Sequence, residues 1–162
     1  TLAEWGVYDP ASKRNPVARS NVCPELHKPS EASFHAFCFT VADNAAAPSF
    51  VVSGSGEAPE GKGAYGNFVV RPGDRSAEGL RDKARAVLGE MERRMGLLGF
   101  NWADATAVQL YTVYDVYEHL ADEIVRRGAT AHGLIWHYCR PPVNVLDYEM
   151  DVRGVPIEQV VA

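Results

Sequence analysis

The chain has 162 residues, of which 46% are hydrophobic and 23% charged, and its formal net charge is −5 at pH 7. This composition is typical of a globular domain and excludes collagen-like, coiled-coil and disordered chains. The acidic balance also disfavours nucleic acid and anionic membranes as partners, because both require clustered cations. No apolar run is long enough to cross a membrane and no signal peptide is recognisable, so we expect a cytoplasmic protein.

The N-terminal segment is expected to form an extended arm. Residues 1–30 contain four prolines and no sustained hydrophobic period, and proline disrupts both helices and central strands. We expect this arm to pack in order against the domain formed by residues 31–162, with Trp5 and Tyr8 as candidate anchors.

Two apolar runs predict the first strands of the domain. Residues 34–41 (FHAFCFTV) are apolar and aromatic, and residues 50–52 form a second buried run that ends in the glycine-containing segment 53–56. A short polar connection between two such runs predicts a hairpin. A further short strand is predicted over residues 67–70.

A long amphipathic helix follows. Apolar side chains recur on one stripe between residues 80 and 95, with charged residues on the other faces. Ser76 is a suitable N-cap, and Gly96 or Gly99 is expected to end the helix.

The second half of the chain alternates strands with a second helix. Strands are predicted over residues 105–114, 132–139 and 145–153, and a helix over residues 116–127 that Gly128 ends. This order predicts an α+β fold in which a mixed β-sheet carries two helices on one face. The strand at 105–114 is apolar on both sides, so the other face requires a partner and oligomerisation is expected.

The last predicted strand carries a candidate catalytic group. Strand alternation places Asp147, Glu149 and Asp151 on one face, together with Arg153. Carboxylates stacked ~7 Å apart repel one another, so one carboxyl of the three is expected to have a raised pKa, as general acid–base chemistry requires. The alternative is a solvated acidic face that Arg153 compensates.

Two weaker signals accompany it. The segment 53–56 could expose backbone groups to a ligand, although a plain turn explains it as well. His132 begins a predicted strand beside the acidic one and is a second candidate, with a structural histidine as the alternative. The cysteines at positions 23, 38 and 139 form no C-x-x-C pair and the histidines do not converge, so no metal or cofactor is expected.

The ordered set of segments resembles the RidA (YjgF) family of reactive-intermediate deaminases. The matching pieces are FVVSGSGEAP, the long helix followed by LGFNWADATAVQLYTVYD, and LDYEMDVRGV, which together extend over residues 34–155. The resemblance implies a chorismate-mutase-like α+β domain and a homotrimer with clefts at the subunit interfaces. It also implies hydrolysis of small imines or enamines with release of ammonia.

The resemblance further assigns roles to individual residues. Glu149 matches the glutamate that positions the attacking water, and Gly54 matches the glycine whose backbone holds the substrate, with Ser53 and Ser55 beside it. Glu123 falls where the family often has a cleft-lining asparagine.

One departure concerns the family arginine that binds the substrate carboxylate. Residues 130–134 contain no arginine, and His132 supplies at most one cation without the guanidinium fork. The substrate is then neutral or aromatic, or its carboxylate is held by the arm or by a neighbouring subunit. Phe34 and Trp136 are expected to add aromatic lining.

Two functions remain open. The first is a hydrolytic deaminase of an enamine or imine, with aromatic-compound catabolism as a candidate setting; Glu149 activates water, Gly54 fixes the substrate and His132 donates a hydrogen bond or proton. The alternative is a non-catalytic trimeric member of the family that binds a small molecule. Glu149 and the segment 53–56 favour the first function, whereas the missing arginine favours the second.

Overall fold

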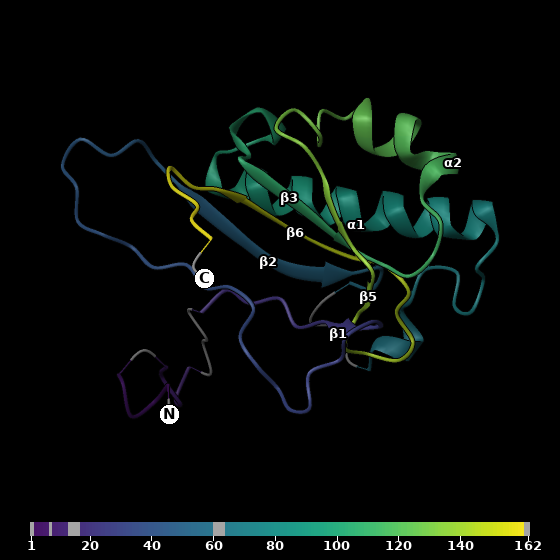
Figure 1. Ribbon diagram of the computed structural model, residues 1–162, viewed down its shortest axis with the longest axis horizontal. Coiled ribbons are helices and arrows are strands. Elements are labelled where there is room, and N and C mark those ends of the chain that lie inside the picture. Colours follow the sequence, from purple (N-terminus) through teal and green to yellow (C-terminus); the bar gives the residue numbers. More distant parts are fainter. Residues whose placement is uncertain (1, 7, 13–16, 60–63, 161–162) are drawn as a thin grey trace.

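A four-stranded mixed sheet forms the centre of the molecule (Figure 1). The computed structural model describes residues 2–6, 8–12, 17–59 and 64–160. The strands lie in the order β2-β6-β3-β4, and neighbours are antiparallel except β3 and β4, which are parallel. Their bounds are Phe50–Gly56 for β2, Glu149–Gly154 for β6, Ala107–Tyr111 for β3 and Ile135–His137 for β4. A separate antiparallel pair joins β1 (Cys23–Pro24) to β5 (Cys139–Arg140).

The first predicted helix is confirmed as α1 (Ala77–Leu98). The side chain of Ser76 accepts the backbone N–H of Gly79 at the start of the helix, as an N-cap does. Gly99, rather than Gly96, ends it in the left-handed conformation with φ 83°, which glycine adopts without steric cost.

The second predicted helix is also present. It begins as α2 (Tyr117–His119) and continues as a π-helical segment, Leu120–Val125, before Gly128 turns the chain at φ 90°. Both helical segments lie on the same face of the sheet (Figure 1), so the predicted α+β architecture is confirmed.

The core lies between α1 and the sheet. The apolar stripe of α1, including Val87, Leu88 and Met91, is completely buried against side chains such as Leu110 of β3 and Met150 of β6. Each large apolar side chain that becomes buried contributes about 1.5–3 kcal/mol relative to exposure. This burial fixes which face of β6 points toward the helices and which points away.

The predicted hairpin is wrong. Residues 34–41 form no strand and are exposed, and β2 pairs with β6 instead. Pairing with β6 places Phe50 and Val52 of β2 in the core over α1. A strand at 34–41 would present its aromatic side chains without a helix of this chain to cover them.

Other predicted strands are absent or shorter. Residues 67–70 contain no strand: a 3₁₀ turn at Tyr65–Asn67 ends at the first of them, and irregular backbone follows. The strands β3, β4 and β6 each begin two to four residues later than their patterns predict. Because β4 begins later than predicted, His132 lies in an exposed turn outside the sheet.

Arg19 and Ser20 of the arm contact the four-stranded sheet, and β1 pairs with β5 beside it. The carbonyl of Arg19 accepts the N–H of Gly54 at 3.2 Å, and the hydroxyl of Ser20 donates to the carboxylate of Asp151. Trp5 is 69% exposed, so its predicted role as an anchor is wrong, whereas Tyr8 is half-buried. The division into an arm (1–30) and a domain (31–162) stays a prediction.

Candidate functional site

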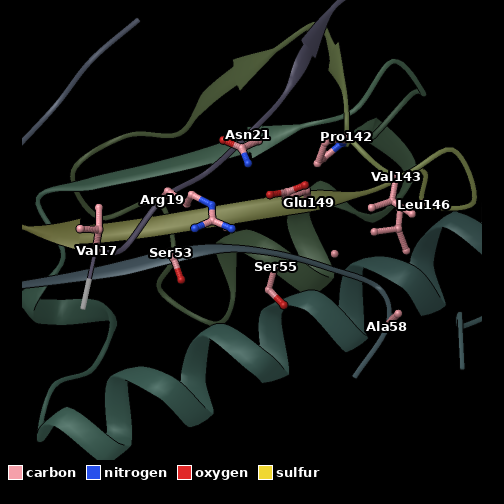
Figure 2. Close-up of a pocket in the computed structure, with 12 residues that line it drawn as sticks. Val17, Arg19, Asn21, Ser53, Ser55, Ala58, Pro142, Val143, Leu146 and Glu149 are labelled. Carbon is pink, nitrogen blue, oxygen red and sulfur yellow. The ribbon is translucent and has the colours of Figure 1, made fainter. Parts of the chain in front are cut away.

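A cavity of about 230 Å³ lies where the arm crosses β2 and the start of β6 (Figure 2). This volume is below the range of about 300–1,000 Å³ that is typical of drug-sized ligands, so the cavity suits a small molecule. Its walls come from the arm, from residues 53–56 of β2 and from the loop before β6. The residues are Val17, Arg19, Asn21, Ser53, Gly54, Ser55, Gly56, Ala58, Pro142, Val143, Leu146 and Glu149.

Glu149 begins β6 and is only 5% exposed. Its neighbour Met150 is buried in the core on the helical side. Successive strand residues point to opposite faces, and the Glu149 carboxylate therefore points away from the helices and into the cavity (Figure 2). A carboxylate placed beside a cavity is suited to accept a proton from a water molecule.

Gly54 lies at the irregular part of β2, where the pairing register with β6 shifts between Val52 and Ser55. A Cβ at this position would overlap Oε1 of Glu149 and lie 3.0 Å from Oγ of Ser20. Only glycine lets the strand and the carboxylate approach this closely. The N–H of Gly54 is engaged by the carbonyl of Arg19, and its role in holding a substrate stays a prediction.

Ser53 and Ser55 line the cavity and also connect β2 to α1. Their hydroxyl oxygens accept from the guanidinium of Arg94 at 3.4 and 3.2 Å. Arg94 in turn pairs with Glu90, and hydrogen bonds from Arg93 and Arg94 lower the pKa of Glu90 to about 2. Figure 2 shows both hydroxyl groups directed toward α1, so these side chains hold β2 against the helix.

The three carboxylates predicted on one face of the last strand have different roles, and none is solvated: all three are buried. Asp151 accepts hydrogen bonds from Tyr111, at 2.8 Å, and from Ser20. Burial and the neighbouring Asp151 raise the pKa of Tyr111, so its hydroxyl remains a donor. The prediction of a solvated acidic face is therefore wrong, and of the three only Glu149 lines the cavity.

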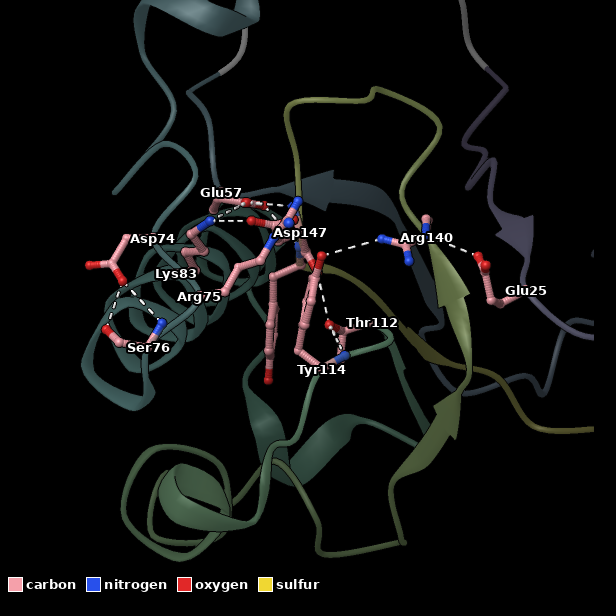
Figure 3. Close-up of polar contacts among 11 residues, drawn as sticks. Glu25, Glu57, Asp74, Arg75, Ser76, Lys83, Thr112, Tyr114, Arg140 and Asp147 are labelled. Atoms are coloured by element: carbon pink, nitrogen blue, oxygen red, sulfur yellow. Dashed lines mark hydrogen bonds and ion pairs between the residues drawn. The ribbon is translucent and has the colours of Figure 1, made fainter.

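Asp147 belongs to an ionic group that we call the Lys83 cluster, in which Lys83, Glu57 and Asp147 are buried and Arg75 is exposed (Figure 3). Nζ of Lys83, which is completely buried, lies 2.5 Å from Oδ2 of Asp147 and 3.6 Å from Oε1 of Glu57. Glu57 accepts the backbone N–H groups of Asp147 and Tyr148 at 2.6 and 3.0 Å. Burial raises the pKa of Glu57. The cluster ties α1 to the segment that leads into β6 and so positions Glu149.

Four residues predicted for the site lie outside the cavity. Phe34 is 93% exposed, and His132 lies in the turn before β4. Trp136 packs against the core on the helical side and donates from Nε1 to the carbonyl of Thr112 at 2.9 Å. Glu123 is buried and pairs with Arg85 at 2.7 Å.

Sequence reasoning did not identify the residues that the arm contributes. Arg19 and Asn21 line the cavity from a segment with no regular pattern. The sequence indicated that the arm could supply the missing cation. It did not indicate which residue of the arm would do so.

The described residues show no cluster of three or more His, Cys, Asp or Glu side chains able to hold a metal ion. Their three cysteines are free thiols. Within the same residues, no helix has both the length and the apolar character needed to cross a membrane.

Comparison with known proteins extends over nearly the whole chain. A family model described as 2-aminomuconate deaminase CnbZ matches residues 1–159. A 2-amino-5-chloromuconate deaminase from Comamonas testosteroni is 49% identical over an alignment that covers 99% of this chain and 64% of that protein. The chain therefore spans less than two thirds of the length of this curated relative.

The fold is also found in a solved structure. YyfB from Yersinia pestis, a Rid-family protein of unknown function, superposes with a TM-score of 0.50 at 15% sequence identity. The match covers 69% of this chain and 81% of that chain. This likeness shows the Rid-like fold that the sequence predicts.

Proposed function

Because the chain belongs to the 2-aminomuconate deaminase CnbZ family, we propose that it hydrolyses 2-aminomuconate or a chlorinated analogue and releases ammonia. The observation that carries the proposal is the buried Glu149 carboxylate, which lines a small cavity against a strand position where only glycine fits. The carbon skeleton of a muconate is that of an opened aromatic ring, so the proposed setting is the breakdown of aromatic compounds.

The proposed reaction replaces one C–N bond with a C–O bond. In 2-aminomuconate the amino group is attached to C2 of a conjugated six-carbon diacid, and addition of a proton from solvent to a diene carbon converts this enamine into the iminium ion. Glu149 then takes a proton from water while the water oxygen bonds to C2. Glu149 returns that proton to the nitrogen of the neutral carbinolamine, the C2–N bond breaks as ammonia leaves, and the C2 hydroxyl becomes a carbonyl by losing its proton to solvent. One water is consumed and no oxidant or reductant is required.

We expect the purified chain to release ammonia from 2-aminomuconate and from 2-amino-5-chloromuconate faster than either compound decays in buffer. Ammonia and the loss of the diene absorbance are measured in parallel, with heat-denatured protein as the control. Binding of these compounds without ammonia release would contradict the proposal and indicate the non-catalytic, ligand-binding alternative.

We also propose that the protein is a homotrimer. Support comes from the exposed apolar segment 34–41, in which the exposed fractions are 93% for Phe34, 75% for Phe37, 76% for Phe39 and 74% for Val41. Contiguous apolar groups of this size are rarely left in water by a monomeric protein. A subunit contact here would cover them.

Light scattering is expected to give a mass of about three times 17.7 kDa at micromolar concentration. Replacing Phe37 and Phe39 together by serine is expected to lower this mass, because the contact loses its aromatic groups. The control is the same double replacement by serine at Leu97 and Leu98, two exposed residues at the end of α1. This variant is expected to keep the wild-type mass. A wild-type monomer at this concentration would contradict the trimer.

A further inference from the structure

We infer that Arg19 binds a carboxylate group of the substrate inside the cavity and so places the reacting carbon beside Glu149. The inference rests on the proposed function, whose substrates are diacids. Among the described residues that line the cavity, Arg19 and Glu149 are the only charged ones. The other described residues that line the cavity are apolar or neutral, so Arg19 is the cation that the described lining offers to an anionic ligand.

The backbone of Arg19 is held in place from two strands. Its carbonyl accepts the N–H of Gly54 in β2, and the adjacent Ser20 donates to Asp151 in β6. Asp151 is itself held by the hydroxyl of Tyr111 in β3. The base of the Arg19 side chain is therefore anchored to the sheet, although the segment that carries it has no secondary structure.

The guanidinium of Arg19 is available for a ligand. Figure 2 shows it directed toward the space into which Glu149 also points. No ion pair involving Arg19 occurs within residues 17–59 and 64–160, whereas the nearby Arg94 is paired with Glu90. A guanidinium presents a planar pair of N–H donors that matches the two oxygens of a carboxylate.

Of the two substrate carboxylates, the position of Arg19 favours binding of the one that is bonded to C2. Water attacks C2 in the proposed reaction, so C2 must lie next to the Glu149 carboxylate. Because Arg19 and Glu149 line the same small cavity, a diacid whose C1 carboxylate meets Arg19 presents C2 to Glu149. Arg19 is then a residue that both binds and orients the substrate.

The test uses muconate, the diacid without the amino group, as a probe that binds but cannot be deaminated. Isothermal titration measures its affinity for the wild-type chain and for R19M, which keeps most of the side-chain length and removes the charge. We expect R19M to bind muconate about 10–100-fold more weakly, as the loss of a charge-assisted hydrogen-bonded pair implies. The dimethyl ester of muconate has no anion, and its affinity is expected to be the same for both proteins.

Two further variants separate the site from general charge effects. R19K keeps the charge but not the fork, and we expect an intermediate affinity. Lys28 is another cation of the N-terminal segment, exposed and outside the cavity, and K28M is expected to bind muconate as the wild type does. Thermal unfolding of each variant checks that the fold is retained.

Wild-type affinity of R19M for muconate, or no binding of muconate by the wild type, would overturn the inference. Because the probe does not react, this result does not depend on turnover. Arg19-dependent muconate binding by a chain that releases no ammonia would support the inference while the proposed deaminase activity fails. If R19M unfolds at the assay temperature, R19Q provides the same comparison.

Discussion

Replacing Glu149 by glutamine is expected to reduce kcat for 2-aminomuconate by about 10²–10⁴-fold, the usual cost of losing a general acid–base group. Glutamine has nearly the same shape as glutamate, but its amide cannot take a proton from water. The side chain is buried beside Gly54 and fills the same space in both proteins. The effect is therefore expected in kcat and not in the stability of the fold. Steady-state ammonia release measures it.

The matched control is Glu123→Gln. Glu123 is also a buried glutamate, but it pairs with Arg85 and lies outside the cavity. Its replacement is expected to leave kcat close to the wild-type value and to lower stability modestly. A Glu149→Gln protein that still turns over at nearly the wild-type rate would exclude Glu149 as the group that activates water.

The largest loss of stability is expected for Lys83→Met, which removes the only cation that lies within the buried part of the Lys83 cluster. Breaking a buried ion pair from one side leaves an uncompensated charge and costs about 3–5 kcal/mol. Glu57 and Asp147 would both remain buried, and among the described residues the half-exposed Arg75 would be the remaining cation paired with Asp147. Chemical denaturation at one fixed protein concentration measures the free energy of unfolding.

The pH dependence of this loss identifies its cause. Burial raises the pKa of Glu57, and the charge of Lys83 opposes that rise, so removing Lys83 is expected to raise the pKa further. The folded variant then takes up a proton at a higher pH than the unfolded chain does. Protonation relieves the buried charge, so the deficit is expected to shrink as the pH falls from 7 toward about 4.5.

Arg93→Met is the control for this variant. Arg93 lies on the same helix with its own side chain 59% exposed, where it pairs with the half-buried Glu90, and ion pairs at the surface contribute only about 0–1 kcal/mol. If Lys83→Met cost no more than Arg93→Met, or cost the same at both pH values, the Lys83 cluster would not stabilise the fold in this way.

The elements that the sequence determined by itself are those whose causes are local. The helix α1 follows from a stripe of apolar residues at helical spacing, with Ser76 and Gly99 at its ends. The alternation in β6 likewise separates Met150 and Val152, which are buried in the core, from the acidic residues between them. The resemblance of the ordered segments to the RidA family also identified Gly54 and Glu149 as candidate site residues. The structure places these two residues in contact.

The tertiary structure alone decided how three similar carboxylates divide their roles. Asp147 meets Lys83, which is 64 residues away in the chain, and Asp151 meets Ser20, which is 131 residues away. Glu149, between them, lines the cavity. Strand alternation assigns a side chain to a face but does not indicate which distant group covers it. The same limitation explains the absence of a strand at 34–41 and the place of Arg19, because strand pairing and the path of an irregular arm depend on contacts between remote parts of the chain.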